Sequence, residues 1–197
     1  LGRDGDFNET RFINILNADL ANDLGNLLNR SLGMVKKYCQ GQGPQLTAQD
    51  LPDHNTLLVL GKTLGDRVIE AYDTLAFSQA CEETFTLVRA SNKYIDETAP
   101  WSLFKQGLQR EVEIVLYSVL ESIRLAAYLL SPIIPNLSTA IYQQLGFTLD
   151  FNQWSELLSQ ANFESHCQWG AFLLPKTPSQ AKPIFVRLEL PTVQTPT

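Results

Sequence analysis

The chain has 197 residues, of which 44% are hydrophobic and 18% charged, a composition typical of a folded globular protein. Its formal net charge of −6 argues against a protein that coats nucleic acid through general attraction to phosphates, but not against one that reads a few unstacked bases. No stretch is long and apolar enough to cross a membrane, so we expect no membrane partner.

The residues that could hold a metal ion are few and scattered. The cysteines are Cys39, Cys81 and Cys167, and the histidines are His54 and His166. None of them has the close spacing of a zinc site, so we expect no metal. Unpaired thiols are typical of a reducing compartment, which indicates a cytoplasmic location.

Helical spacing of apolar residues dominates the first three quarters of the chain. Asn8 is a good N-cap for a first long helix, which we expect to run toward Cys39 with a possible break near Asn17. Gly and Pro in residues 41–44 end it. Four further helices are predicted over residues 56–75, 77–98, 110–130 and 136–145, with a linker over residues 105–110.

The pattern changes after residue 150. Residues 154–158 form at most a short helix, and residues 169–174 and 183–188 are typical of extended segments around a turn. We therefore predict an all-α fold, an antiparallel bundle of about five helices with a short C-terminal extended or hairpin appendage. The expected divisions are a bundle over 1–150, an appendage over 151–190 that packs back toward it, and a tail over 191–197.

The sequence contains no recognisable catalytic constellation. A glycine-rich phosphate loop and a Gly-x-Ser-x-Gly motif are both absent, and neither histidine lies in a nucleophile–base setting. Adjacent acids such as Glu82 and Glu83 point in different directions on a helix, so they do not converge on one site.

A possible recognition surface remains. Asn26 and Arg30 are four residues apart and share a helix face, where an amide can pair with a base edge and a guanidinium can bind phosphate or stack on a base. Trp101 follows Pro100, which fixes the backbone at a helix end, so its indole lies at a defined place. From the residues alone, a solvated polar face is the commoner explanation of Asn26 and Arg30, and Trp101 is more often a core or interface residue than a base platform.

Several motifs in order resemble the anticodon-binding domain of methionyl-tRNA synthetase. Two of them carry the resemblance, Asn-Ala-Asp-Leu-Ala-Asn-Asp-Leu-Gly-Asn-Leu-Leu-Asn-Arg over residues 17–30 and Asn-Lys-Tyr-Ile-Asp-Glu-Thr-Ala-Pro-Trp over residues 92–101. Residues 2–7, which resemble the junction leaving the catalytic half, and residues 130–135 and 183–185 also fit. The resemblance covers essentially the whole chain.

The resemblance implies an α-helix bundle that recognises the CAU anticodon loop of tRNA-Met, with a C-terminal segment that folds back toward the catalytic domain. By position, Trp101 is similar to the family's tryptophan that stacks on the anticodon cytosine. Asn26 and Arg30 match the asparagine and arginine that contact anticodon bases. Pro100 would set the position of the indole, and Asp96 lies in the same motif with a less defined role.

The chain departs from the family by lacking its catalytic half. The His-x-Gly-His-type and Lys-Met-Ser-Lys-Ser-type motifs are absent, and so is the zinc-binding insertion. The resemblance therefore implies no cofactor in this chain, because the ATP and zinc sites belong to the absent catalytic domain. The expected partners are the anticodon stem-loop of tRNA-Met and the catalytic domain of a longer parent chain, a methionine–tRNA ligase.

Two alternatives stay open. One is the similar helical domain of a leucyl-, valyl-, isoleucyl- or cysteinyl-tRNA synthetase. The other is a helical scaffold that binds protein, with Trp101 as an anchor. In that case Trp169, Phe172, Ile184 and Phe185 would form an exposed apolar cluster.

Overall fold

The structure is a computed structural model that describes residues 7–150 and 163–190. The short helix expected over residues 154–158 and the tail over 191–197 lie outside the described residues. The helices are α1 (Glu9–Leu16), the π-helix η1 (Asn17–Gly25), α2 (Asn26–Tyr38), the 3-10 helix η2 (Ala48–Asp50), α3 (Thr56–Asp73), α4 (Phe77–Thr98), α5 (Pro100–Lys105), α6 (Gln109–Leu130), α7 (Pro135–Leu145) and α9 (Phe163–His166).

Local signals in the sequence place the helix ends. The side chain of Asn8 caps α1 by accepting a hydrogen bond from the Arg11 N–H at 2.8 Å, and Asn55 caps α3 in the same way. Pro135 occupies the first turn of α7, where its missing N–H costs nothing, and Gly146 ends that helix with φ 94°. The five predicted helices are therefore present, close to their expected bounds.

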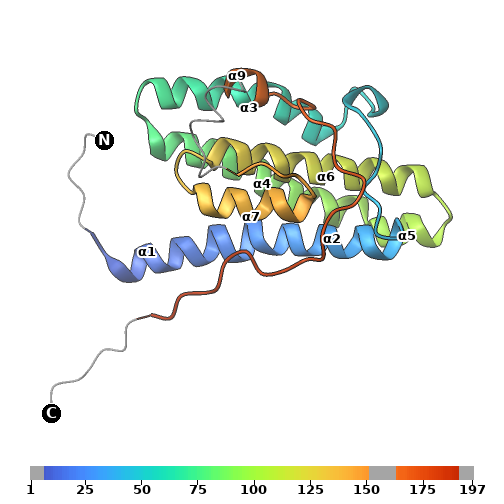
Figure 1. Cartoon of the computed structure of the whole chain (residues 1–197), viewed down its shortest axis with the longest axis horizontal. Coiled ribbons are helices and arrows are strands. Elements are labelled where there is room, and N and C mark those ends of the chain that lie inside the picture. Colours follow the sequence, from blue (N-terminus) through green and yellow to red (C-terminus); the bar gives the residue numbers. More distant parts are fainter. Residues whose placement is uncertain (1–6, 151–162, 191–197) are drawn as a thin grey trace, which may run out of the picture.

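The first long helix does not break near Asn17 but widens there. From Asn17 to Gly25 the backbone is π-helical, and the N–H of Asn26 bonds to the carbonyl of Ala21, five residues earlier. Helices α1 and α2 are thus joined through η1 into one continuous rod along an edge of the bundle (Figure 1).

The main helices follow an up-and-down path, so consecutive members α2, α3, α4, α6 and α7 run antiparallel (Figure 1). Helix α6 is buried on all sides over most of its length and packs against α2, α3, α4, α5 and α7. The all-α bundle is confirmed. The linker expected over residues 105–110 is shorter than predicted, because the short helix α5 ends only at Lys105 and α6 already begins at Gln109.

The C-terminal segment is extended, but within residues 163–190 it forms no strand and no hairpin. Its backbone groups bond to the helices instead. Gln144 of α7 accepts from the Lys182 N–H and donates to the Lys182 carbonyl, both at 2.9 Å, and the Gly43 N–H donates to the carbonyl of Lys176. Polar helix side chains therefore replace the partner strand that a hairpin requires.

The end of this segment crosses η1 (Figure 1). The side-chain amide of Asn17 exchanges two hydrogen bonds with the backbone of Leu188, each 2.9 Å long. Arg187 donates to the side-chain oxygen of Asn22 at 2.7 Å. We call residues 167–190 the strap, because it connects α6, α7 and η1.

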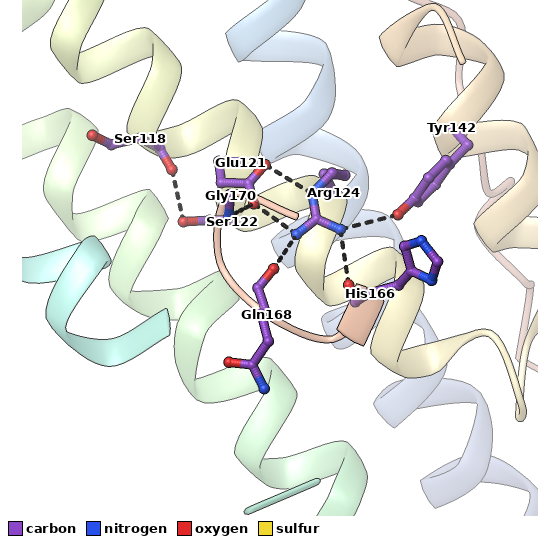
Figure 2. A network of polar contacts seen from close by, with 8 residues as sticks. All are labelled: Ser118, Glu121, Ser122, Arg124, Tyr142, His166, Gln168 and Gly170. Carbon is purple, nitrogen blue, oxygen red and sulfur yellow. Dashed lines mark hydrogen bonds and ion pairs between the residues drawn. The ribbon is translucent and has the colours of Figure 1, made fainter. Parts of the chain in front are cut away.

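A fully buried ion pair anchors the beginning of the strap (Figure 2). Arg124 donates to both carboxylate oxygens of Glu121, at 2.6 and 2.8 Å, and to the carbonyl of Gln168 at 2.9 Å. Glu121 also accepts from the Gly170 N–H at 2.7 Å. Burial alone would lower the pKa of Arg124, but the Glu121 carboxylate outweighs this effect and raises the pKa, so the guanidinium stays charged.

Two glycines of α3 make room for the strap. A Cβ placed on Gly61 would lie 2.0 Å from the ring of Trp169, and one on Gly65 would lie 2.4 Å from the carbonyl oxygen of Cys167. Trp169 is only 9% exposed as a result. The indole is therefore a part of the hydrophobic core.

Candidate nucleic-acid interface

Helix α2 lies beside the α4–α5 pair and runs in the same direction, because they are second neighbours on the up-and-down path. Three contacts follow one another along the two rods: Asn92 to the carbonyl of Asp23 at 3.1 Å, Arg30 to Asp96 at 2.7 Å, and Tyr38 to Phe104 with ring centroids 4.8 Å apart. The two sequence motifs, more than sixty residues apart in the chain, are thus neighbours in space.

Arg30 and Asp96 form the contact that links the two motifs. The Nη2 of Arg30 donates to Oδ1 of Asp96, and the two side chains are 41% and 62% exposed. A pair so open to solvent contributes only about 0–1 kcal/mol to stability. The pair matters for geometry, because Asp96 directs the Arg30 guanidinium toward α4. The other N–H groups of Arg30 have no acceptor among the described residues.

The turn between α4 and α5 fixes Trp101. Ala99 ends α4 in the left-handed conformation, with φ 43° and ψ 63°, and Pro100 is buried at the first position of α5. The indole of Trp101 is 40% exposed. It is not enclosed by the core, so much of its surface is open to a ligand.

Asn26 begins α2, directly after the π-helical segment, and is exposed. It precedes Arg30 by about one turn on the same face, and its side chain has no hydrogen-bond partner among the described residues. Lys37 continues this face and is also exposed, whereas Asn22 is half-buried by its contact with Arg187 of the strap.

Metal-binding groups and membrane-spanning helices were not expected from the sequence. In residues 7–150 and 163–190, no three His, Cys, Asp or Glu side chains are grouped so that they could hold a metal ion. No helix of the same part of the chain is long and apolar enough to span a membrane.

The apolar cluster expected of a protein-binding scaffold is not exposed. Trp169 is buried, and Ile184 and Phe185 are half-buried against the core. Phe172 stacks on the ring of His166 at 4.7 Å. The prediction that these side chains would be available to a partner is wrong, because the strap turns them onto the protein's own helices.

Phe104 is a candidate site residue that the sequence did not indicate. It is 42% exposed and lies three residues after Trp101 on α5, so the two aromatic side chains are neighbours on one helix. The sequence feature that could have indicated α5, and with it Phe104, is Pro100. A proline at a first helical position often starts a helix as well as ending the preceding one.

The chain is similar in sequence to a known protein family. Residues 56–177 match a family model described as the anticodon binding domain of methionyl tRNA ligase. The chain is 67% identical over 191 residues to a methionine–tRNA ligase of Synechocystis sp., covering 96% of the chain and 36% of that relative. It is 40% identical over 197 residues to a chloroplastic/mitochondrial methionine–tRNA ligase of Arabidopsis thaliana, covering 96% of the chain and 30% of the relative.

A solved structure agrees in fold. The apo methionyl-tRNA synthetase of Mycobacterium tuberculosis superposes with a TM-score of 0.80 at 31% identity, over 96% of this chain and 37% of that one. The fold and the comparisons together define a helical anticodon-binding domain of an aminoacyl-tRNA synthetase. Within that class, the chain belongs to the family of anticodon-binding domains of methionyl-tRNA ligases. It spans about a third of the length of the relatives it matches.

Proposed function

We propose that this chain binds the CAU anticodon loop of tRNA-Met, and that it does so for a longer parent chain that joins methionine to this tRNA. The observation that carries the proposal is the Arg30–Asp96 contact at 2.7 Å, because it brings the polar face of α2 next to the helix end that presents Trp101. Asp96, Pro100 and Trp101 lie inside the residues matched by the family model, and Asn26 and Arg30 lie before them.

Trp101 supplies a stacking face for an unstacked base, which we assign to the anticodon cytosine. Base–aromatic stacking contributes about 1–3 kcal/mol per base. The left-handed turn at Ala99 and the buried Pro100 fix the backbone that carries the ring before RNA binds.

Arg30 and Asn26 supply the hydrogen bonds that stacking lacks. A flat aromatic face accepts every base, so discrimination between bases requires donors and acceptors at their edges. The Asn26 amide offers both, and the Arg30 guanidinium offers donors beyond the one held by Asp96. Asp96 is thus a positioning residue for Arg30.

The parent enzyme supplies the chemistry. Its catalytic domain would hold ATP and zinc, and this chain would need no cofactor of its own. We place the protein in the cytoplasm, in keeping with three thiols that form no disulfide. The acidic balance of the chain opposes the RNA phosphates, so we expect the isolated domain to bind weakly.

Titration of a labelled anticodon stem-loop at low salt tests the proposal. We expect CAU to bind more tightly than a loop changed at its first anticodon base, and Trp101→Ala to weaken CAU binding by about 5- to 150-fold. Lys62→Ala is the control for general charge, since Lys62 is exposed on α3, across the bundle from α2 (Figure 1). Equal affinity for both loops, or no effect of Trp101→Ala, refutes base reading.

The same titration separates the other synthetases. Stem-loops with the anticodons for leucine, valine, isoleucine and cysteine share the stem and differ only in the bases read. We expect each to bind more weakly than CAU, and tighter binding of any of them would reassign the specificity.

A further inference from the structure

A groove of about 610 Å³ opens beside Phe104, beyond the residues assigned to the anticodon. It lies between the last turn of α2, the loop that follows it, α5 and the first turn of α6. The residues of interest in its wall are Lys37, Tyr38, Gln42, Phe104, Gln109 and Glu113.

The Phe104 ring has a supported side and an open side. It packs on Tyr38, with 4.8 Å between ring centroids and 37° between the planes, yet 42% of the side chain is exposed. Trp101 precedes it by three residues on α5, so an RNA strand that meets the indole passes next to this ring. A backed aromatic with an open face is a stacking platform of the kind that single-stranded RNA uses.

The charges of the groove are unequally distributed. Lys37 is exposed at its rim, with its ammonium 5.3 Å from the centroid of the Tyr38 ring, and it has no carboxylate partner in the described part of the chain. Glu113 is half-buried at the inner end, where its carboxylate accepts from the Gln109 amide at 3.2 Å. A phosphate is thereby favoured at the rim and disfavoured inside, whereas an amino group of a base is favoured inside.

Polar groups for a base edge are also present. The Gln42 side chain is exposed and has no hydrogen-bond partner among the described residues, so its amide can both donate and accept. The nearest other cation in the wall, Arg110, is already held by Asp50 at 2.7 Å. Lys37 is therefore the cation available to a ligand.

We propose that this groove binds a second nucleotide of the same RNA loop, one that flanks the anticodon, with its base stacked on Phe104 and its phosphate at Lys37. The proposal rests on the proposed function, because it needs the strand that Trp101 engages. It extends the interface from the anticodon itself to a neighbouring base that carries an amino group.

A double-mutant cycle between protein and RNA provides the first test. Stem-loops in which one nucleotide on either side of the anticodon is abasic are titrated against the wild-type chain, Phe104→Ala and Phe104→Leu. For one of the two positions we expect the abasic change to weaken binding by about 5- to 150-fold in the wild type and to have little effect in Phe104→Ala.

Phe104→Leu is the control for folding. It keeps an apolar contact with Tyr38 but removes the aromatic face, so it should reproduce the loss seen in Phe104→Ala. Additive effects of protein and RNA changes at both flanking positions overturn the proposal.

Cys39 offers an independent footprint, because it also lines the groove. Bound stem-loop should slow alkylation of Cys39 but not of Cys81, which is half-buried elsewhere on α4. Lys37→Gln should make the slope of log affinity against log salt shallower by about 0.7, the value for one phosphate contact to a single strand, and Lys62→Gln should leave it unchanged. Unprotected Cys39 under saturating RNA overturns the proposal.

The two proposals fail in different ways. If CAU binding depends on Trp101 while the Phe104 variants and the Cys39 footprint show no effect, only the second nucleotide site is refuted. If Trp101→Ala and the anticodon change have no effect, the base-reading function is refuted, and the groove proposal falls with it.

Discussion

Replacing Glu121 by Gln should strongly destabilise the bundle. The substitution keeps the size of the side chain and removes its charge, so Arg124 is left as a cation with no counter-ion at 0% exposure. Breaking a buried pair in this way costs about 3–5 kcal/mol. For a chain of this size, that corresponds to a fall in Tm of about 6–20 °C.

Urea denaturation, followed by circular dichroism with the slope m held common to all variants, measures this effect. Glu97→Gln is the matched control, because its ion pair with Lys93 is exposed and should contribute less than about 0.5 kcal/mol. The double change Glu121→Leu and Arg124→Met should cost less than Glu121→Gln alone, since no buried charge remains. A loss below about 1 kcal/mol for Glu121→Gln would refute the reasoning.

Three further predictions concern single positions. Gly61→Ala should lower the free energy of unfolding by about 1–3 kcal/mol, because the added methyl group overlaps the Trp169 ring. Gly33→Ala, on an open part of α2, should raise the free energy of unfolding by about 0.5–1 kcal/mol. Both are measured by urea denaturation, and equal effects of the two changes would contradict the packing described. Burial raises the pKa of the Cys39 thiol to about 11, so its alkylation rate, followed by mass spectrometry, should still rise between pH 9 and pH 10.5, and a plateau near pH 9 would argue against that burial. Gln40 has φ 55°, so Gln40→Gly should relieve strain and raise the Tm by about 1–4 °C; an unchanged or lower Tm would show that the left-handed residue is not strained.

Much of the bundle could be predicted from local sequence alone. Helix α4 begins and ends where the pattern placed it, and α7 follows from a proline before it and a glycine after it. These signals are local, because caps and breakers act within a turn of the residue concerned. The π-helical stretch of η1 could not be recognised in the same way, since its buried leucines, Leu20 and Leu24, are four residues apart, a spacing that also fits an α-helix.

The parts that were missed depend on distant partners. Two strand-like segments after residue 163 gave no hairpin, because Gln144 and Asn17 bind the backbone that a second strand would have paired. In the sequence, Glu121 and Arg124 only interrupt an apolar run. Their spacing of three residues indicates a pair, but its burial depends on carbonyl groups more than forty residues further along the chain.

For the candidate site, the sequence supplied the residue types and the structure supplied their proximity. The spacing of Asn26 and Arg30 indicates a shared face, but no local rule places Asp96 beside Arg30. That contact arises because the up-and-down path returns α4 alongside α2 in the same direction. The roles of Asn26, Arg30 and Trp101 in RNA binding stay predictions.

The bonds between Leu188 and Asn17 and between Arg187 and Asn22 have a practical consequence for handling the domain. A version cut back to residue 182 would leave both asparagines without these partners. It would also remove Ile184, whose side chain lies 3.8 Å from where a Cβ on Gly25 of η1 would be. Because η1 leads directly into the turn that carries Asn26, such a shortened domain should displace Asn26, which the proposed function assigns to anticodon bases, even where its helices melt at the same temperature. Affinity tags and fusion partners therefore belong after Leu190, where they leave these hydrogen bonds intact.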